Sequence, residues 1–156
     1  MSHHITIFTD GSSRGNPGPG GWGAILMYGD KIKELSEAYR KTTNNRMELL
    51  AVIKSLQHIK NKTIPILIYS DSKYVVDAVE KKWLDKWIKT DFKGGKKNKD
   101  LWIQYHELQK TLKIQFHWVK GHADNPYNNK CDELATAAAD NGPWNIDSVF
   151  ENTIDE

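Results

Sequence analysis

The sequence predicts an α/β fold: a mixed five-stranded sheet with three antiparallel strands, then two parallel strands, and helices on both faces. Three observations lead to this class. The first 40 residues contain three strand-like segments separated by turns, which favours an antiparallel meander. From residue 44 onward, amphipathic helical segments alternate with short apolar runs, which is typical of strands joined by crossover helices. The chain has 156 residues, enough for one domain with its own core.

The first two strands are separated by a glycine-rich stretch. Residues 5–10 form a short β-rich run that ends at Asp10, and WGAILMY forms the second strand. Gly18, Gly20 and Gly23 fit the spacing G-x-G-x-x-G of dinucleotide-binding loops. That motif needs a helix after the glycines, so that the helix N-terminus meets the pyrophosphate. A strand follows here, and we therefore interpret the glycines as a turn.

The remaining elements follow in order along the chain. A third strand is expected at about residues 31–40, after the turn at Gly29-Asp30. In NNRMELLAVIKSLQHIK apolar residues recur every three or four positions, which predicts a helix, and Asn45 with Glu48 resembles its capping start. IPILIYS and IQFHWVK are the two later strands. We expect three helices between them, at about 74–79, 83–88 and 101–112, and an alanine-rich helix at 131–139.

Charge is distributed unevenly along the chain. Residues 81–99 hold eight lysines against two aspartates, and the lysines interleave with Trp83 and Trp87. Such a block is either a solvated helix face or a nucleic-acid contact, and both interpretations stay open on this feature alone. Residues 140–156 hold five acidic residues and no basic one, and we expect the tail from residue 141 to be partly disordered at best.

The cysteine count and hydropathy bear on the compartment. Cys131 is the only cysteine, so an intramolecular disulfide is impossible, which suits a reducing environment. No apolar run approaches the length of a signal sequence core or a membrane span. We therefore expect a cytoplasmic protein that does not enter a membrane.

Four carboxylates are predicted to converge at one edge of the sheet. Asp10 and Asp71 end strands that are expected to lie side by side and parallel, so both project at the carboxyl edge, where ligands bind in open α/β sheets. Glu48 lies in the first turn of the intervening helix, and Asp132 opens the last helix. Each residue also has a purely structural explanation, because Asp71 or Asp132 could cap a helix and Glu48 could complement a helix dipole.

The convergence of four acids favours a metal site. Like charges in one site raise each other's pKa and destabilise the fold unless a cation neutralises them. Oxygen ligands without cysteine or a histidine pair select Mg²⁺ or Mn²⁺ over Zn²⁺. Two such ions can activate a water molecule and stabilise the leaving oxygen of an in-line phosphoryl displacement.

Five ordered motifs resemble the bacterial ribonuclease HI (type 1 ribonuclease H) family, whose members cut the RNA strand of RNA–DNA hybrids. The motifs are TDGSSRGNPGPGGWG, TTNNRMEL, SDSKYV, the basic protrusion at residues 81–99, and WVKGHADNPYNNKCDELA. The resemblance covers about residues 4–140. It implies a ribonuclease H-like fold, a catalytic domain at 1–140, an acidic tail at 141–156, and two-metal hydrolysis that gives 3′-hydroxyl and 5′-phosphate ends.

The resemblance also assigns the residues that carry the chemistry. The carboxylate tetrad of the family falls on Asp10, Glu48, Asp71 and Asp132. Asp10 would bridge two Mg²⁺ ions, with Mn²⁺ as a possible substitute; Glu48 and Asp71 would hold one ion and Asp132 the other. The loop histidine of the family falls on His122. GHADN alone suggests a solvated loop histidine, whereas beside a phosphodiester this group would shuttle a proton or help the product leave.

A hybrid presents 2′-hydroxyls in a shallow minor groove, and short polar groups can read them. Gly11, Asn16, Asn44 and Asn45 suit this role, although helix capping would explain one of the two adjacent asparagines. Lys73 stands where we expect an uncharged amide after Asp71-Ser72, and it exchanges a groove hydrogen bond for a phosphate contact.

The resemblance assigns the DNA strand to a second group of residues. Thr43, Lys41 and Asn98 would grip one of its phosphates. Trp83 would lie along its sugars, and the lysines of the protrusion, among them Lys86 and Lys89, would take phosphates further out.

Two other classes of protein fit the sequence less well. A hybrid-binding module without catalysis would be favoured by the loss of a tetrad acid, and all four acids are present. A transposase- or integrase-type nuclease usually carries further DNA-binding domains, for which the chain has no room. We therefore expect a monomeric endonuclease that acts on RNA–DNA hybrids and needs no obligate protein partner.

Overall fold

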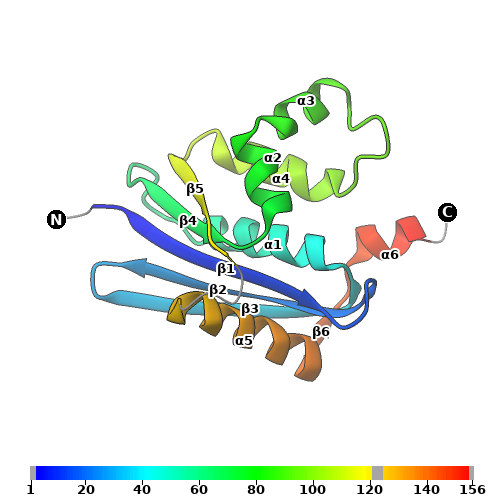
Figure 1. Ribbon diagram of the computed structural model, residues 1–156, viewed down its shortest axis with the longest axis horizontal. Coiled ribbons are helices and arrows are strands. Elements are labelled where there is room, and N and C mark those ends of the chain that lie inside the picture. Colours follow the sequence, from blue (N-terminus) through cyan, green and yellow to red (C-terminus); the bar gives the residue numbers. More distant parts are fainter. Residues whose placement is uncertain (1–2, 121–124, 155–156) are drawn as a thin grey trace.

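The computed structural model describes residues 3–120 and 125–154 and confirms the predicted mixed α/β class (Figure 1). Six strands form one sheet in the order β5-β4-β1-β2-β3-β6. The three strands β1, β2 and β3 are antiparallel, and β4, β5 and β6 each run parallel to their partners. The sheet therefore has one strand more than the sequence predicts, and the extra strand comes from the C-terminal tail.

The glycine-rich stretch has a different role in the structure from the one that the sequence predicts. β1 spans Ile5–Ser13, β2 spans Gly18–Tyr28 and β3 spans Lys31–Thr42. The glycines from Gly20 to Gly23 lie inside β2, where they pair with residues 10–13 of β1, so the interpretation of these glycines as a turn is wrong. A strand still follows the first glycines, which excludes the dinucleotide-binding arrangement.

Two of these glycines are required by a helix on the other side of the sheet. A Cβ atom at Gly21 or Gly23 would lie 2.6 Å from a backbone oxygen of α5, which spans Pro126–Asn141. The absence of side chains at these two positions lets α5 lie directly on the strand. Close approach between backbones, and not chain reversal, accounts for glycine at these two positions.

The parallel part of the sheet follows the prediction. β4 spans Ile66–Ser70 and β5 spans Ile114–Trp118, and β4 pairs in parallel with both β1 and β5. Four helices lie among these strands in the chain: α1 (Asn44–Gln57), α2 (Lys73–Glu80), α3 (Trp83–Lys89) and α4 (Lys99–Gln109). The start of α1 differs from the expectation. Thr43, and not Asn45, caps the helix, because its hydroxyl accepts a hydrogen bond from the backbone N–H of Arg46 at 3.2 Å.

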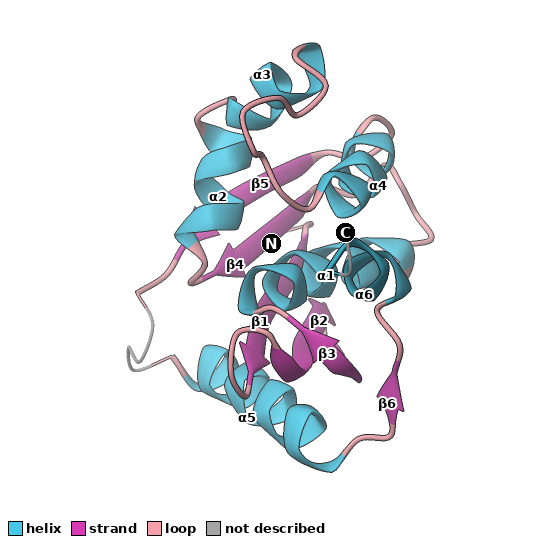
Figure 2. Cartoon of the chain, turned by 90° about the vertical axis from the view of Figure 1, so that its right-hand side faces the viewer, coloured by secondary structure: helices cyan, strands magenta, loops and turns pink. Residues whose placement is uncertain are grey.

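Helices cover the two faces of the sheet unequally. The helix α1 packs on one face with α4 against it, and α5 packs on β1, β2 and β3 from the other face (Figures 1 and 2). The main core lies on the α1 side, and its largest fully buried side chain is Trp102 of α4. None of the helices in the described ranges is both long and apolar enough to cross a membrane.

The acidic tail is ordered as far as residue 154, so the expectation of partial disorder is wrong for this part. β6 (Trp144–Asn145) pairs with Ala38 and Tyr39 of β3, and α6 spans Ser148–Ile154. Figures 1 and 2 show α6 beside the N-terminal end of α1. The acids of the tail find basic partners in the body of the domain, because Glu151 pairs with Arg40 at 2.9 Å. Such tertiary pairing removes the repulsion that made the tail look disordered.

Candidate active site

Three carboxylates from three different elements meet at the carboxyl edge of the sheet. Asp10 of β1 and Asp71 after β4 each follow the last pair of the parallel ladder, Thr9 with Ser70, so both reach the same edge as expected. Glu48 approaches from α1. One carboxylate oxygen from each of the three residues lies within 4.8 Å of the others.

Gly11 allows α1 to come this close. A Cβ atom at Gly11 would collide with the backbone nitrogen of Glu48, so any side chain there would push the helix away from β1. Glu48 is the fifth residue of α1 and is buried against Asp10, which excludes the explanation that it only complements the helix dipole. The alternative role of Asp71 as a cap is also excluded, because the Ser72 hydroxyl caps α2 by accepting from the N–H of Val75 at 3.2 Å.

The crowding of these acids has a clear electrostatic consequence. Burial, followed by the charge of Asp71, raises the pKa of Asp10 to about 7, although the N–H of Gly11 donates to its Oδ1 at 2.9 Å. Burial and the charges of Asp10 and Asp71 raise the pKa of Glu48 well above its ordinary value. Glu48 Oε1 is buried without a hydrogen-bond partner in the described part of the chain. A buried acceptor among carboxylates fits an oxygen-binding cation such as Mg²⁺ or Mn²⁺.

Asp132 faces the same cavity from α5 but lies outside the three-carboxylate group. The cavity has a volume of about 440 Å³ and is lined by all four acids. Asp132 does not open its helix as predicted. α5 begins at Pro126 and is capped by Asn125, whose side chain accepts from the N–H groups of Tyr127 and Asn128, so Asp132 is not a cap. It is exposed, in contrast to Asp10 and Glu48.

Further polar residues of the cavity escaped the sequence analysis. Ser12, Tyr74, Asn128 and Asn129 line it, and Asn128 is buried with an Oδ1 that has no hydrogen-bond partner among residues 3–120 and 125–154. A signal for Asn128 exists in the sequence, because it precedes Asp132 by four residues and therefore shares its face of the helix.

The predicted groove residues divide between this cavity and a larger one beside it. Gly11, Asn44, Asn45 and Lys73 line the carboxylate cavity. The adjoining groove, of about 1010 Å³, shares Asn45 and Tyr74 with it, and its other predicted members are Asn16, Thr43, Trp83 and Asn98. The two cavities therefore form one continuous depression that leads from the acids towards the basic protrusion.

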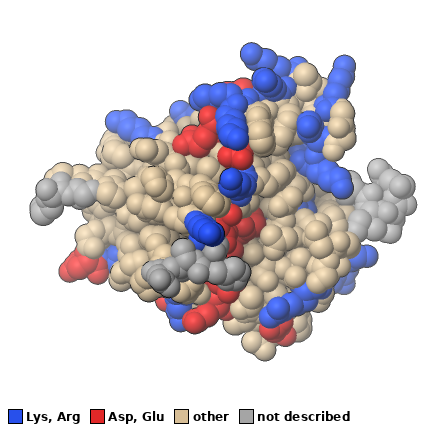
Figure 3. Space-filling view, in the orientation of Figure 1, with Lys and Arg blue, Asp and Glu red and all other residues tan. Residues whose placement is uncertain are grey.

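Three of the predicted lysines lie outside the groove. Lys41 is exposed on β3 and lines neither cavity. Lys86 lines a separate hollow of about 490 Å³ with Trp83 and Trp87, and Lys89 is exposed at the end of α3. Figure 3 shows that basic side chains gather over the protrusion and acidic ones in the middle of the same face.

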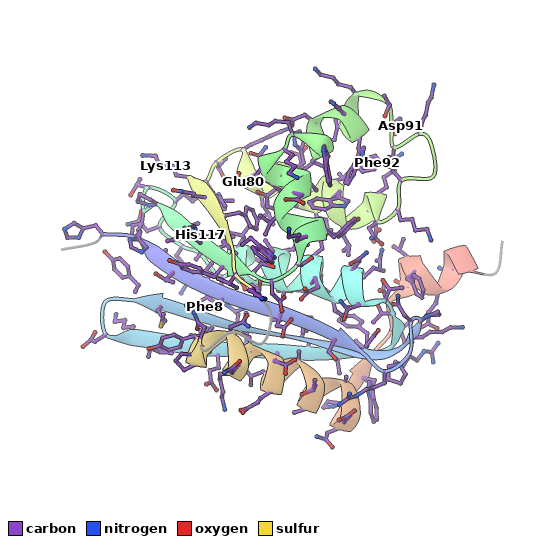
Figure 4. The ribbon with its side chains drawn as sticks, in the orientation of Figure 1. Phe8, Glu80, Asp91, Phe92, Lys113 and His117 are labelled. Atoms are coloured by element: carbon purple, nitrogen blue, oxygen red, sulfur yellow. The ribbon has the colours of Figure 1, made fainter. Side chains whose placement is uncertain are left out.

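The protrusion is folded around aromatic side chains. Phe92 is buried and packs on Trp87 with ring centroids 6.4 Å apart, and Asp91 beside it pairs with Lys99 at 2.7 Å (Figure 4). Trp83 stays 38% exposed on the groove, with the Lys81 ammonium 5.4 Å from its ring centroid. The protrusion thus presents cations and one open aromatic surface, as a nucleic-acid contact requires.

Lys73 is held at the rim of the carboxylate cavity. Its ammonium lies 4.6 Å from the centroid of the Trp118 ring, and the Trp118 indole N–H donates to the backbone oxygen of Asp71 at 3.2 Å. His122, predicted as a catalytic residue, lies outside the described residues.

Comparisons with known proteins agree with this fold. The family model "RNase H" matches residues 2–140. A protein of Chlorobium luteolum named Ribonuclease H is 52% identical over 147 residues, which cover 92% of this chain and 100% of that protein. Among solved structures, LC9-RNase H1, described as a type 1 RNase H with the type 2 active-site motif, superposes with a TM-score of 0.78 at 25% identity, covering 90% of this chain and 74% of that one. LC11-RNase H1 in complex with an RNA/DNA hybrid superposes with a TM-score of 0.66 at 23% identity, covering 87% and 96%.

Proposed function

The chain belongs to the ribonuclease H family and is an endoribonuclease, and on this premise we propose that it hydrolyses the RNA strand of RNA–DNA hybrids with two divalent metal ions, leaving 3′-hydroxyl and 5′-phosphate ends. The observation that carries the proposal is the group formed by Asp10, Glu48 and Asp71, with a buried carboxylate oxygen that lacks a partner in the described ranges. A bound cation would relieve the mutual repulsion of these acids at neutral pH.

The residues divide the chemistry between them. Asp10 would hold both ions, Glu48 and Asp71 would complete the site of one, and Asp132 would reach the other from α5. When bound, two such ions supply an activated water and charge stabilisation at the leaving oxygen. Oxygen ligands alone make Mg²⁺ the preferred ion and Mn²⁺ a substitute. His122 would move a proton at the leaving group or assist release of the product.

The groove supports the hybrid as substrate. Asn44 and Asn45 offer short polar groups beside the carboxylates, and Asn16 offers one from the adjoining groove. Such groups suit recognition of 2′-hydroxyls in a minor groove. The related LC11-RNase H1 was solved with an RNA/DNA hybrid. We propose that the RNA strand crosses the carboxylate cavity and that Lys73 contacts one of its phosphates.

The adjoining groove would take the DNA strand. Thr43 and Asn98 line it and would grip a phosphate together with Lys41, while the exposed ring of Trp83 would lie along the sugars. Lys86 and Lys89 would act further out through charge alone. A monomer that acts in the cytoplasm without a protein partner stays our prediction.

Strand-labelled duplexes test the proposal directly. The protein is incubated with RNA–DNA, RNA–RNA and DNA–DNA duplexes in Mg²⁺, in Mn²⁺ and in chelator, and the ends are identified by ligation and phosphatase sensitivity. We expect internal cuts in the RNA strand of the hybrid alone, with metal only, and with 5′-phosphate ends. Cleavage of the DNA strand, or binding to the hybrid without cleavage, would overturn the proposal.

A further inference from the structure

Arg46 of α1 is buried at the centre of an ion network behind the groove. Its side chain is 4% exposed, and its guanidinium has five N–H donors. Two go to each of two carboxylates: Asp100 of α4 at 2.7 and 2.9 Å, and Asp147 of the tail at 2.7 and 2.9 Å. Burial alone would lower the pKa of Arg46, but its hydrogen bonds with Asp100 and Asp147 raise it above the ordinary value. The guanidinium is therefore a fixed cation.

The fifth donor goes to a neutral group, the side-chain amide of Asn98. Arg46 Nη1 donates to Asn98 Oδ1 at 3.3 Å. Because Arg46 can only donate, the amide oxygen must face it, and the NH₂ group must face the other way. One N–H of that group donates to the Tyr74 hydroxyl at 3.0 Å. The second N–H has no acceptor within the described ranges, and Asn98 lines the groove that we assign to the DNA strand.

The backbone alone does not fix Asn98. The residue precedes α4 in the left-handed conformation, with φ 65° and ψ 31°, and its side chain makes no capping hydrogen bond to the helix. The orientation of its amide therefore depends on the two neighbours, Arg46 and Tyr74.

The tail completes the network. Asp147 is 8% exposed and accepts two hydrogen bonds from the Arg46 guanidinium. It also accepts a hydrogen bond from the Thr42 hydroxyl at 2.8 Å. The centroid of the Phe150 ring, also in the tail, lies 5.8 Å from Arg46 Cζ. Phe150 and Val149 both line the groove.

We propose that Asp147 is a positioning residue for substrate: through Arg46 it holds the Asn98 amide with one N–H directed at a DNA-strand phosphate. Docking of the C-terminal tail and the grip on the DNA strand are then linked. The inference rests on the proposed function, since it needs a hybrid in the groove. It assigns no part in bond cleavage to the tail.

A protein–substrate cycle tests the link. KM and kcat are measured with Mg²⁺ on hybrids that carry one uncharged methylphosphonate at successive positions of the DNA strand. For the natural protein we expect one position at which the substitution raises KM about 10- to 100-fold, the range of one hydrogen bond to a charged group. Asn98→Ala and Asp147→Asn should each raise KM on the unmodified hybrid and reduce the penalty at that position, where Thr43 and Lys41 still contact the phosphate. kcat should stay within about twofold.

The controls separate positioning from folding. Asp140→Asn removes a carboxylate of equal charge from the same part of the chain, where it pairs with exposed Arg14 at 2.7 Å, and should keep the full penalty. Circular dichroism gives the folded fraction of each variant. If Asp147→Asn does not fold, Arg46→Lys replaces it, because a lysine keeps the charge between Asp100 and Asp147 but lacks the planar fork that reaches Asn98.

Each outcome decides the proposal. A folded Asp147→Asn protein that keeps the full penalty, or an Asn98→Ala protein that keeps it in full, overturns the inference. If no methylphosphonate position raises KM in the natural protein, the inference is also overturned, whereas the proposed hydrolysis of hybrids still stands. A natural protein that cleaves no hybrid at all defeats the proposed function itself.

Discussion

Asp10→Asn should stabilise the metal-free protein at neutral and alkaline pH. The pKa of Asp10 is raised from 3.8 to about 7, chiefly by burial and by the charge of Asp71. Because the pKa of Asp10 is higher in the folded state than in the unfolded state, ionisation of Asp10 opposes folding. The favourable contribution of the protonated acid is fully present below about pH 3.8 and is lost as the pH rises through about 7.

The size of the effect follows from the shift. A pKa difference of about 3 units, at about 1.4 kcal/mol for each unit, corresponds to a change of about 4 kcal/mol in the free energy of unfolding. Asparagine approximates the protonated acid in shape and stays neutral at every pH. The free energy of unfolding of the variant should therefore exceed that of the natural protein by about 4 kcal/mol at pH 8 and by close to zero at pH 4.

Urea denaturation in chelator at pH 4, 6 and 8 measures this difference. Asp132→Asn is the matched control: Asp132 is exposed and outside the three-carboxylate group, so the change should stay within about 0.5 kcal/mol. Adding Mg²⁺ should stabilise the natural protein more than the variant and narrow the gap. A difference that is absent at pH 8, or constant from pH 4 to pH 8, would refute the electrostatic reasoning.

Three further predictions concern activity. Asp71→Asn should keep hybrid binding, measured by fluorescence anisotropy, and lose nearly all cleavage, because the metal site loses a charged ligand while the groove survives; full cleavage would contradict the two-metal assignment. His122→Ala should leave binding near normal and slow turnover by about 10- to 100-fold, and an unchanged rate from pH 6 to pH 9 would make it an ordinary loop histidine. Replacing Lys86, Lys89 and Lys93 together should flatten the slope of log K against log salt by about 2 and hold kcat within about twofold. An unchanged slope would identify these lysines as a solvated face, and a loss of kcat at saturating hybrid would show that they position the scissile bond.

Local patterns predicted the parts of the site that depend on strand order. Asp10 and Asp71 each stand at the end of an apolar run, and the parallel pairing of those runs was enough to bring the two acids together. The same reasoning missed why Gly21 and Gly23 occur, because the helix that needs them lies more than 100 residues further along the chain. Glycine spacing alone does not separate a turn from a strand on which a helix packs closely.

The tail shows that charge composition is also a poor guide when ion pairs join distant parts of the chain. Its acids suggested disorder, since composition cannot reveal that Asp147 has a buried partner in Arg46. Asn98 was assigned a phosphate contact through the resemblance alone, and its fixed orientation depends on neighbours from two other elements. Long-range pairs of this kind are decided by the fold and are not visible in any short window of sequence.

The distance along the chain between Arg46 and Asp147 also sets an order of events during synthesis. The two residues are 101 positions apart, so at about 5 to 20 residues per second the ribosome adds the aspartate about 5 to 20 s after the arginine. Asp100 is itself added 54 positions after Arg46, so only in the last part of that interval can the guanidinium have partners for three of its five donors, with one carboxylate beside it. The three acids of the carboxylate group lie within the first 71 residues, whereas the wall of the DNA-strand groove is complete only after Asp147, Val149 and Phe150 have been added.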